Sequence, residues 1–169
     1  MIDMYRFDWN DQKVLSRNRL EPRIHFYPYA DAGAALQGKD TDRVEHLNGS
    51  WNFNWFSSPL EVPASLLESP YDPAGRSIQV PMNWQFAGYG KFCYTDLLYP
   101  FPVDPPHVPV QNETGVYRRA FYANRTPGER LMLRFEGVES AFHVYVNGRQ
   151  AGYSQGSRMP SEFDITELA

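Results

Sequence analysis

Short segments in which apolar and polar residues alternate are the feature that most limits the fold of this chain. In residues 50–56, Trp51, Phe53 and Trp55 alternate with small polar side chains, as in a strand with one buried face. Further strands are expected at 76–80, 116–122, 130–135, 141–146, 149–154 and from Glu162 onward. Asn147-Gly148 is a strong signal for a two-residue type I′ hairpin turn. Many short strands with frequent turn signals predict an all-β fold, either an antiparallel sandwich or a jelly roll.

The first part of the chain lacks this alternation. Residues 1–45 show no sustained period of a strand or a helix, so we expect an extended, aromatic-rich arm along a surface. A short helix is expected near residues 30–36, where alanines are frequent. The remaining residues, 46–169, form the predicted sandwich. A jelly roll needs about eight strands. The sequence offers six or seven, so we expect the chain to end before the last strands of the fold.

Charge and hydropathy exclude several classes of protein. The chain has 169 residues and a formal net charge of -4, and its basic residues are scattered, which argues against a nucleic-acid partner. No apolar run approaches the length of about 18 residues that a transmembrane helix needs, so no membrane partner is expected. The amino terminus does not resemble a secretory signal peptide, and Cys93 is the single cysteine. We therefore expect a cytoplasmic protein.

Residues 99–109 are the least regular part of the predicted sandwich. They contain five prolines, each of which removes a backbone donor, so neither a helix nor a central strand is expected there. The pattern predicts an ordered, polyproline-like crossing over the surface. The composition also matches ligands of SH3 and WW domains, but the flanking strands and aromatic residues favour the ordered crossing. A short helix is expected at 64–68.

No catalytic sequence motif stands out. Glycosidases use two carboxylates about 5 to 10 Å apart. Four glutamates could contribute to such a pair, but nothing in the sequence brings two of them together: Glu113, Glu136, Glu139 and Glu162. His143 lies in the middle of a predicted strand, where a structural role is expected. Glu162 and Asp164 are expected to form ion pairs with Arg158.

One loop has the residue types of a sugar-binding site. Asp96 lies among tyrosines in a segment that follows Gly88-Tyr89-Gly90. A carboxylate accepts hydrogen bonds from sugar hydroxyls, and aromatic rings stack on the C–H faces of a sugar. The alternative is an ordinary loop in which Asp96 accepts hydrogen bonds from nearby backbone amides.

Several sequence segments taken together resemble the amino-terminal domain of β-galactosidases of glycoside hydrolase family two, the long bacterial type. They are Leu47-Asn48-Gly49-Ser50-Trp51, Val80-Pro81-Met82-Asn83-Trp84, Tyr94-Thr95-Asp96, Asn112-Glu113-Thr114-Gly115 and Ser157-Arg158-Met159-Pro160-Ser161-Glu162-Phe163-Asp164. Such segments run in order along most of the chain. The resemblance implies a galactose-binding-like jelly roll. It also implies that the catalytic glutamates and the principal metal ligands belong to a (β/α)8 barrel that is absent from this chain.

The resemblance implies a function for the complete enzyme and a part in it for this domain. The complete enzyme hydrolyses terminal β-galactosides, such as lactose, with retention of configuration. The loop that matches Tyr94-Thr95-Asp96 reaches into the active site, where Asp96 contacts the galactosyl hydroxyls. Some members carry Asn at this position, and the carboxylate of Asp96 keeps the acceptors but lacks the amide donor.

The resemblance also implies cofactors and assembly partners. No cofactor is expected in this chain, whereas Mg²⁺ and Na⁺ are expected in the complete enzyme. Some relatives hold a cation between the arm and a loop near Gln155, and Asp8 and Asp11 fall at similar positions. The arm takes part in the assembly of a homo-oligomer in tetrameric relatives, which would bury the exposed aromatic residues Tyr5, Phe7 and Trp9.

Two other functions are compatible with the same fold. One is an autonomous carbohydrate-binding module, and the other is a purely structural or oligomerisation domain in which Asp96 is an ordinary loop residue. Fold alone cannot choose among them. A stand-alone module usually gathers several sugar-contacting residues in one cleft, whereas here one loop carries the expected contact. The sequence therefore favours a domain that contributes one loop to a site built elsewhere.

Overall fold

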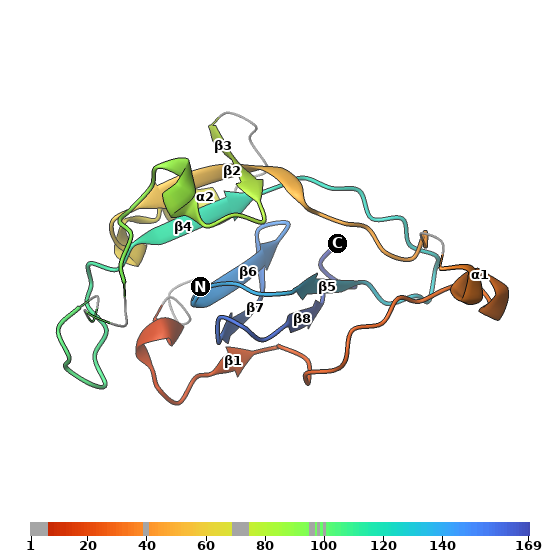
Figure 1. Cartoon of the computed structure of the whole chain (residues 1–169), viewed down its shortest axis with the longest axis horizontal. Coiled ribbons are helices and arrows are strands. Elements are labelled where there is room, and N and C mark those ends of the chain that lie inside the picture. The colour runs from red at the N-terminus through yellow and green to blue at the C-terminus, as the bar shows by residue number, and fades with distance from the viewer. Residues whose placement is uncertain (1–6, 39–40, 69–74, 95–96, 98, 100) are drawn as a thin grey trace.

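The computed structural model describes residues 7–38, 41–68, 75–94, 97, 99 and 101–169. Most of its regular elements are short antiparallel strands, so the all-β prediction is confirmed (Figure 1). The strands are β1 (Ser16–Arg17), β2 (Gly49–Phe56), β3 (Arg76–Val80), β4 (Thr114–Arg118), β5 (Met132–Phe135), β6 (Ala141–Val146), β7 (Arg149–Gln155) and β8 (Ser161–Asp164). The helices are α1 (Ala32–Gln37), α2 (Ala64–Glu68) and three 3-10 helices, Asp8–Asn10, Pro59–Glu61 and Trp84–Ala87, in the described residues.

The strands form three small sheets in the described part of the chain. Their strand orders are β3-β2-β4, β1-β7-β6 and β5-β8, and every pairing is antiparallel. In Figure 1 the sheet of β2, β3 and β4, called the first sheet below, lies above a layer that contains β5, β6, β7 and β8, called the second layer. The sheets thus face one another as in a sandwich, and α1 lies at the periphery of the molecule.

The first sheet is built on the aromatic alternation of β2. Phe53 is 1% exposed, and its ring lies 6.1 Å from that of Trp84 and 4.7 Å from that of Tyr117. Gly115 on β4 is directly opposite Trp55, and a Cβ at Gly115 would lie 2.6 Å from both the Phe53 and Trp84 rings. The aromatic side chains therefore fill the space that a larger residue at position 115 would need.

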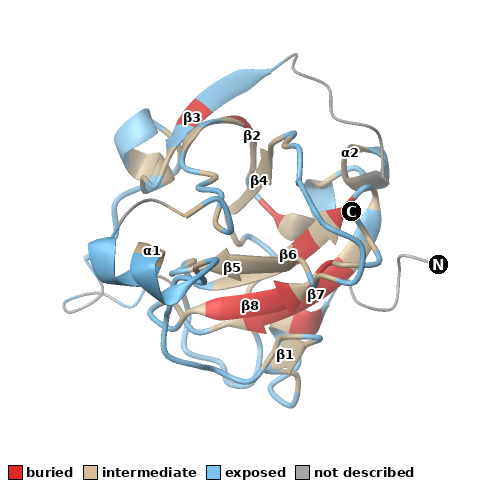
Figure 2. Cartoon of the chain, turned by 90° about the vertical axis from the view of Figure 1, so that its right-hand side faces the viewer, coloured by how far each residue is buried: buried red, intermediate tan, exposed pale blue. Residues whose placement is uncertain are grey.

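The buried core lies mainly on the second layer. Its apolar residues come from β6, β7 and the segment that begins with β8, and Figure 2 shows the buried residues on these strands. Phe163 is fully buried, and Ile165 is 1% exposed. The predicted hairpin is confirmed, because Asn147 and Gly148 adopt positive φ angles of 49° and 75° between β6 and β7. This turn determines which side chains of the two strands face the core.

One predicted strand is shorter than the sequence indicates. The predicted strand continues to Tyr122, but β4 ends at Arg118 and Tyr122 is 93% exposed. The pairing of β4 with β2 stops where Arg118 faces Asn52. The guanidinium of the next residue, Arg119, donates to the carbonyl oxygens of Leu47 and Asn48, both at 3.1 Å. A side chain thus satisfies carbonyl groups that a longer strand would have paired.

The arm is attached to the second layer more closely than its irregular sequence indicates. Within it, β1 pairs with β7, Arg19 forms an isolated bridge with Phe163, and the backbone N–H of Leu20 donates to the carbonyl of Glu162 at 2.9 Å. The helix expected near residues 30–36 is α1, which the side chain of Asp31 caps by accepting from the N–H of Ala34. The two-residue length of β1 explains why no periodic signal marked it.

A buried carboxylate joins the arm to the sandwich. Glu162 is 5% exposed and accepts two hydrogen bonds of 2.7 Å from the guanidinium of Arg23 and one of 3.1 Å from Arg134. The expected pairing with Arg158 is wrong, because Asp164 instead accepts from Arg130 at 2.7 and 2.9 Å. Arg23 is 139 residues from Glu162 in sequence, so local spacing could not reveal this pair.

Candidate functional site

Asp96, the sugar contact expected from the sequence, lies outside the described residues. The structure does describe the base of its loop, from the 3-10 helix Trp84–Ala87 to Tyr94. Gly88 ends this helix with a left-handed φ of 85°, and the N–H of Tyr89 donates to the carbonyl of Trp84 at 3.2 Å. The Tyr89 ring then packs edge-on against Phe53 at 4.8 Å. The loop therefore starts from a point anchored on β2.

Aromatic and aliphatic side chains project into solvent beyond this anchor. Phe86, Phe92 and Tyr94 are 74%, 70% and 68% exposed, and the Phe86 and Phe92 rings meet edge-on at 5.4 Å. Leu97 and Tyr99 are also exposed. Exposed rings in a group offer the apolar faces on which sugars stack or another domain packs. Trp84, by contrast, packs against Phe53 and Gly115, so its ring belongs to the packing of the first sheet rather than to the exposed group.

A second carboxylate lies at the base of the same loop. Gly90 has a φ of 64°, and a Cβ there would lie 2.2 Å from Oε2 of Glu113, so the Glu113 side chain contacts the loop backbone. Glu113 was one of four glutamates that the sequence could not place. The contact joins residues far apart in the sequence, and no local pattern marks it.

The other titratable cluster lies where the arm meets the second layer. Asp8 is 4% exposed, and its two oxygens accept hydrogen bonds of 2.9 and 2.8 Å from Nε of Arg17. Nε2 of His143 lies 3.3 Å from Oδ2 of Asp8, and the His143 ring lies 4.7 Å from the Tyr153 ring. His143 thus has a structural role, as predicted, in holding the arm to β6.

Tyr153 makes the stability of this cluster sensitive to alkaline pH. The side chain is fully buried, and burial together with the nearby Asp8 charge raises its pKa from 10.0 to about 12. An unfolded chain releases this proton near pH 10, whereas the folded chain holds it to about pH 12, so the stabilisation is complete below pH 10 and is lost as the pH rises to 12. We expect the free energy of unfolding to fall more steeply over this range in wild type than in Tyr153→Phe. The free energy of unfolding is measured by denaturant titration at each pH. If it fell with pH to the same extent in wild type and Tyr153→Phe, this assignment would be wrong.

The three residues at positions like those of a cation site in relatives have protein partners here. Besides the pairing of Asp8 with Arg17, Oδ1 of Asp11 accepts from the N–H of Lys13 at 2.9 Å. Gln155 accepts from the hydroxyl of Tyr153 and donates to the carbonyl of Val14, both at 3.4 Å. Because the Asp8 carboxylate is paired with Arg17, it is not available to bind a cation. Among the described residues, no three or more His, Cys, Asp or Glu side chains gather in a group that could hold a metal ion.

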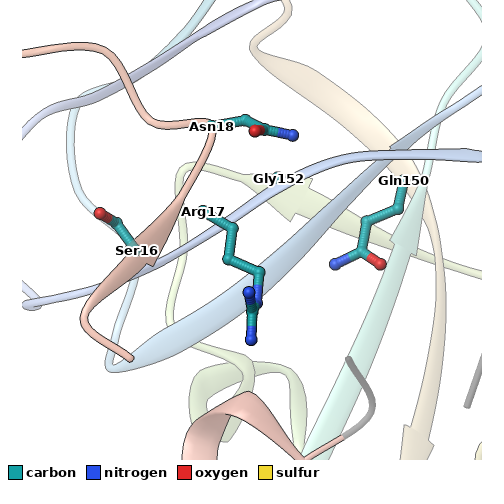
Figure 3. Close-up of a pocket in the computed structure, with 5 residues that line it drawn as sticks. All are labelled: Ser16, Arg17, Asn18, Gln150 and Gly152. Atoms are coloured by element: carbon teal, nitrogen blue, oxygen red, sulfur yellow. The ribbon is translucent and has the colours of Figure 1, made fainter. Parts of the chain in front are cut away.

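A hollow of about 450 Å³ lies beside this cluster, lined by Ser16, Arg17, Asn18, Gln150 and Gly152. In Figure 3 the side chains of Arg17 and Gln150 extend toward the same space from β1 and β7. None of these five described residues is aromatic or acidic, and the guanidinium of Arg17 is already paired with Asp8. The described lining therefore lacks the ring and the carboxylate that favour sugar binding. No helix in the described part of the chain is long and apolar enough to cross a membrane.

Comparison with known proteins defines the class of this domain. The model of the glycosyl hydrolases family 2, sugar binding domain, matches residues 44–169. The chain therefore belongs to this family of sugar-binding domains. The resemblance predicted from the sequence is confirmed.

The similar proteins include named enzymes. The chain is 43% identical over 166 residues to a β-galactosidase of Alteromonas mediterranea, a match that covers 95% of this chain and 16% of that protein. It is 40% identical to the β-galactosidase of Yersinia enterocolitica over 96% of this chain and 16% of that enzyme. It is also 40% identical to the β-galactosidase of Pectobacterium atrosepticum, a match that covers 95% of this chain and 16% of that enzyme. The chain thus spans about one sixth of the length of these relatives.

A solved structure of Bifidobacterium dentium β-glucuronidase complexed with coumarin-3-O-glucuronide is also similar. It is 26% identical, with a TM-score of 0.49, and the match covers 73% of this chain and 17% of that one.

Proposed function

We propose that this chain is the sugar-binding domain of a β-galactosidase that hydrolyses terminal non-reducing β-D-galactose residues, as in lactose, with retention. The observation that carries the proposal is identity of 40–43% to three β-galactosidases along 95–96% of this chain. In this enzyme the two glutamates that act as acid/base and nucleophile belong to the catalytic barrel. This domain is inactive alone and supplies a substrate loop and assembly contacts.

Asp96 is the residue that we assign to the sugar. The loop base anchored through Tyr89 and the exposed rings of Phe92 and Tyr94 support a part in substrate binding. The carboxylate would accept hydrogen bonds from galactosyl hydroxyls, while the rings offer apolar faces to the sugar. The domain thereby shapes the substrate site without performing the chemistry.

Substitution of Asp96 tests this assignment. We expect Asp96→Ala in the complete enzyme to lower kcat/KM about 10- to 150-fold, since each lost charge-assisted hydrogen bond is worth roughly 1.5 to 3 kcal/mol. Asp96→Asn keeps one acceptor oxygen and should retain more activity. Asp104→Ala is the matched control, because Asp104 is an exposed carboxylate on the following segment. A wild-type kcat/KM in Asp96→Ala would refute the assignment and favour a purely structural domain.

A further proposal concerns the location of the enzyme in the cell. We place it in the cytoplasm, because a chain with the single cysteine Cys93 forms no internal disulfide of the kind common in secreted domains.

We also propose a homo-oligomer in which the arm meets another subunit. Phe7, 48% exposed, supports this, while Tyr5 lies outside the described residues. The exposed ring of Phe86, at the base of the loop, would instead pack against other domains of the same enzyme.

For Mg²⁺ and Na⁺ we propose ligands in the catalytic domain, because the residues of this chain that the structure describes form no group that could hold a metal ion. A chelator should therefore abolish hydrolysis by the complete enzyme, and added Mg²⁺ should restore it. The denaturation midpoint of the present chain should not change, since the Asp8 carboxylate is paired with Arg17. A lower midpoint of this chain in chelator would show that it binds the metal itself.

A further inference from the structure

The chain contains two Asn-Gly pairs, and the fold holds them differently. Asn48-Gly49 lies at the start of β2, whereas Asn147-Gly148 forms the tip of the hairpin between β6 and β7. An Asn that precedes Gly is especially prone to deamidation, because Gly has no side chain to hinder attack by its backbone nitrogen on the side-chain amide before it. The reaction then depends on how the fold holds that nitrogen and that amide.

The backbone nitrogen of Gly49 is held within the first sheet. Gly49 pairs with Val80 of β3. Arg119, just beyond β4, donates to the carbonyls of Asn48 and Ser50 at 3.1 and 3.5 Å, so the carbonyls of these two residues face the β4 side of the sheet. Successive residues of a strand direct their backbone groups to opposite neighbours, so the N–H of Gly49 points toward β3. Attack by this nitrogen therefore requires local opening of the sheet.

The backbone nitrogen of Gly148 lies outside the ladder of its hairpin. Val146 and Arg149 are the facing pair next to the turn. In a two-residue turn such flanking residues make the closing hydrogen bonds, so the N–H of Gly148 takes no part in them. Asn147 is exposed, and its Nδ2 donates to the carbonyl of Leu168 at 2.9 Å. The net strength of one exposed hydrogen bond is small, so it only weakly restrains the side-chain amide.

We propose that Asn147 is a site of spontaneous deamidation, whereas the first sheet protects Asn48. Hydroxide takes the proton from the backbone nitrogen of Gly148, and that nitrogen bonds to Cγ of Asn147. The bond from Cγ to Nδ2 breaks, Nδ2 takes protons from water and leaves as ammonia, and a succinimide ring remains. Water then opens the ring at either carbonyl and gives aspartate or isoaspartate. The net change is the loss of ammonia and the gain of water, with no oxidant or reductant.

Deamidation removes a contact between the hairpin tip and the turn at residues 165–169. Nδ2 of Asn147 is the donor to the Leu168 carbonyl, and beside it the Arg149 guanidinium donates to the Glu167 carbonyl at 3.2 Å. A carboxylate at position 147 has no donor and places a negative charge against the Leu168 carbonyl. Isoaspartate also adds a backbone atom to a turn whose length sets the hairpin register. The product therefore loosens the turn at 165–169.

Peptide mapping of the complete enzyme by mass spectrometry measures both sites in one sample. The enzyme is incubated in mildly alkaline buffer made with heavy-oxygen water, so that deamidation during the incubation is marked by the oxygen it takes up. We expect Asn147 in the folded enzyme to react roughly 10-fold or more faster than Asn48, because the sheet must open before Asn48 can react. In denaturant the two sites should react at similar rates, since both are followed by Gly.

Asn147→Asp reproduces the aspartate product and tests its structural consequence. The N–H groups of Leu168 and Ala169 donate to the carbonyl of Ile165 at 2.9 and 3.1 Å. We expect hydrogen exchange of these two amides to accelerate about 2- to 4-fold in the variant, as for the loss of one exposed hydrogen bond. Asn48→Asp is the matched control, because it makes the same chemical change at the other Asn-Gly pair and should leave both amides unchanged.

Equal rates at Asn48 and Asn147 in the folded enzyme would overturn the proposal. So would an unreacted Asn147 in the folded enzyme after the denatured sample has reacted completely. Unchanged exchange of the Leu168 and Ala169 amides in Asn147→Asp would overturn the loosening of the turn. These measurements use no substrate, so their results do not depend on the assignment of this domain to a β-galactosidase.

Discussion

Phe163→Ala is expected to lower the free energy of unfolding by about 3 to 5 kcal/mol, the range for removing a buried aromatic side chain. Phe163 is fully buried, and its ring lies 6.1 Å from those of both Phe135 and Phe142. The Phe163 ring also fills the space beside Gly152, where a Cβ would lie 2.5 Å from it. Truncation would therefore open a cavity where β5, β6, β7 and β8 meet.

Denaturant titration measures this loss. Phe86→Ala is the control, because Phe86 is 74% exposed and its truncation should change stability by no more than about 0.5 kcal/mol. If Phe163→Ala were as stable as Phe86→Ala, the core would not lie where the structure places it.

Removal of the carboxylate at Glu162 is expected to have the second largest effect. Glu162→Ala leaves Arg134, only 14% exposed in its side chain, without its buried partner and releases Arg23 from the sandwich. Breaking a buried ion pair costs about 3 to 5 kcal/mol. We expect a value near the lower end, about 3 kcal/mol, because Arg23 is 40% exposed and can turn into water.

Glu136→Ala is the matched control for this prediction. Glu136 also accepts from Arg134, at 2.7 Å, but its side chain is 65% exposed. Solvent screens this pair, so its loss should cost less than about 1 kcal/mol. Equal losses in Glu162→Ala and Glu136→Ala would contradict the conclusion that the buried carboxylate joins the arm to the sandwich.

The elements predicted correctly from sequence are those specified by local pattern. The aromatic alternation around Phe53 gives β2, and Asn147-Gly148 gives the hairpin of β6 and β7, because each depends on neighbouring residues. The strand expected to reach Tyr122 ends early because Arg119 reaches across to the carbonyls of another segment. Local pattern has no information about such a contact.

The parts missed at the candidate site depend on contacts between distant residues. Asp8 meets His143 across 135 positions, and Glu113 meets Gly90 through the fold rather than through a motif. Asp8, Gly90 and Glu113 are ordinary residues of irregular segments, and the strand pattern around His143 does not indicate its partner. The assignment of Asp96 came from family resemblance and stays a prediction, since the residue lies outside the described part of the structure.

Hydrolysis by the complete enzyme is the first measurement to make on the assignment of this domain to a β-galactosidase. We would measure kcat/KM for nitrophenyl β-D-galactoside and nitrophenyl β-D-glucuronide side by side, with the present chain alone as a third sample. We expect hydrolysis of the galactoside with retention, far slower hydrolysis of the glucuronide, and no turnover by this chain alone. Preference for the glucuronide, or turnover by this chain alone, would contradict the assignment of this domain to a β-galactosidase.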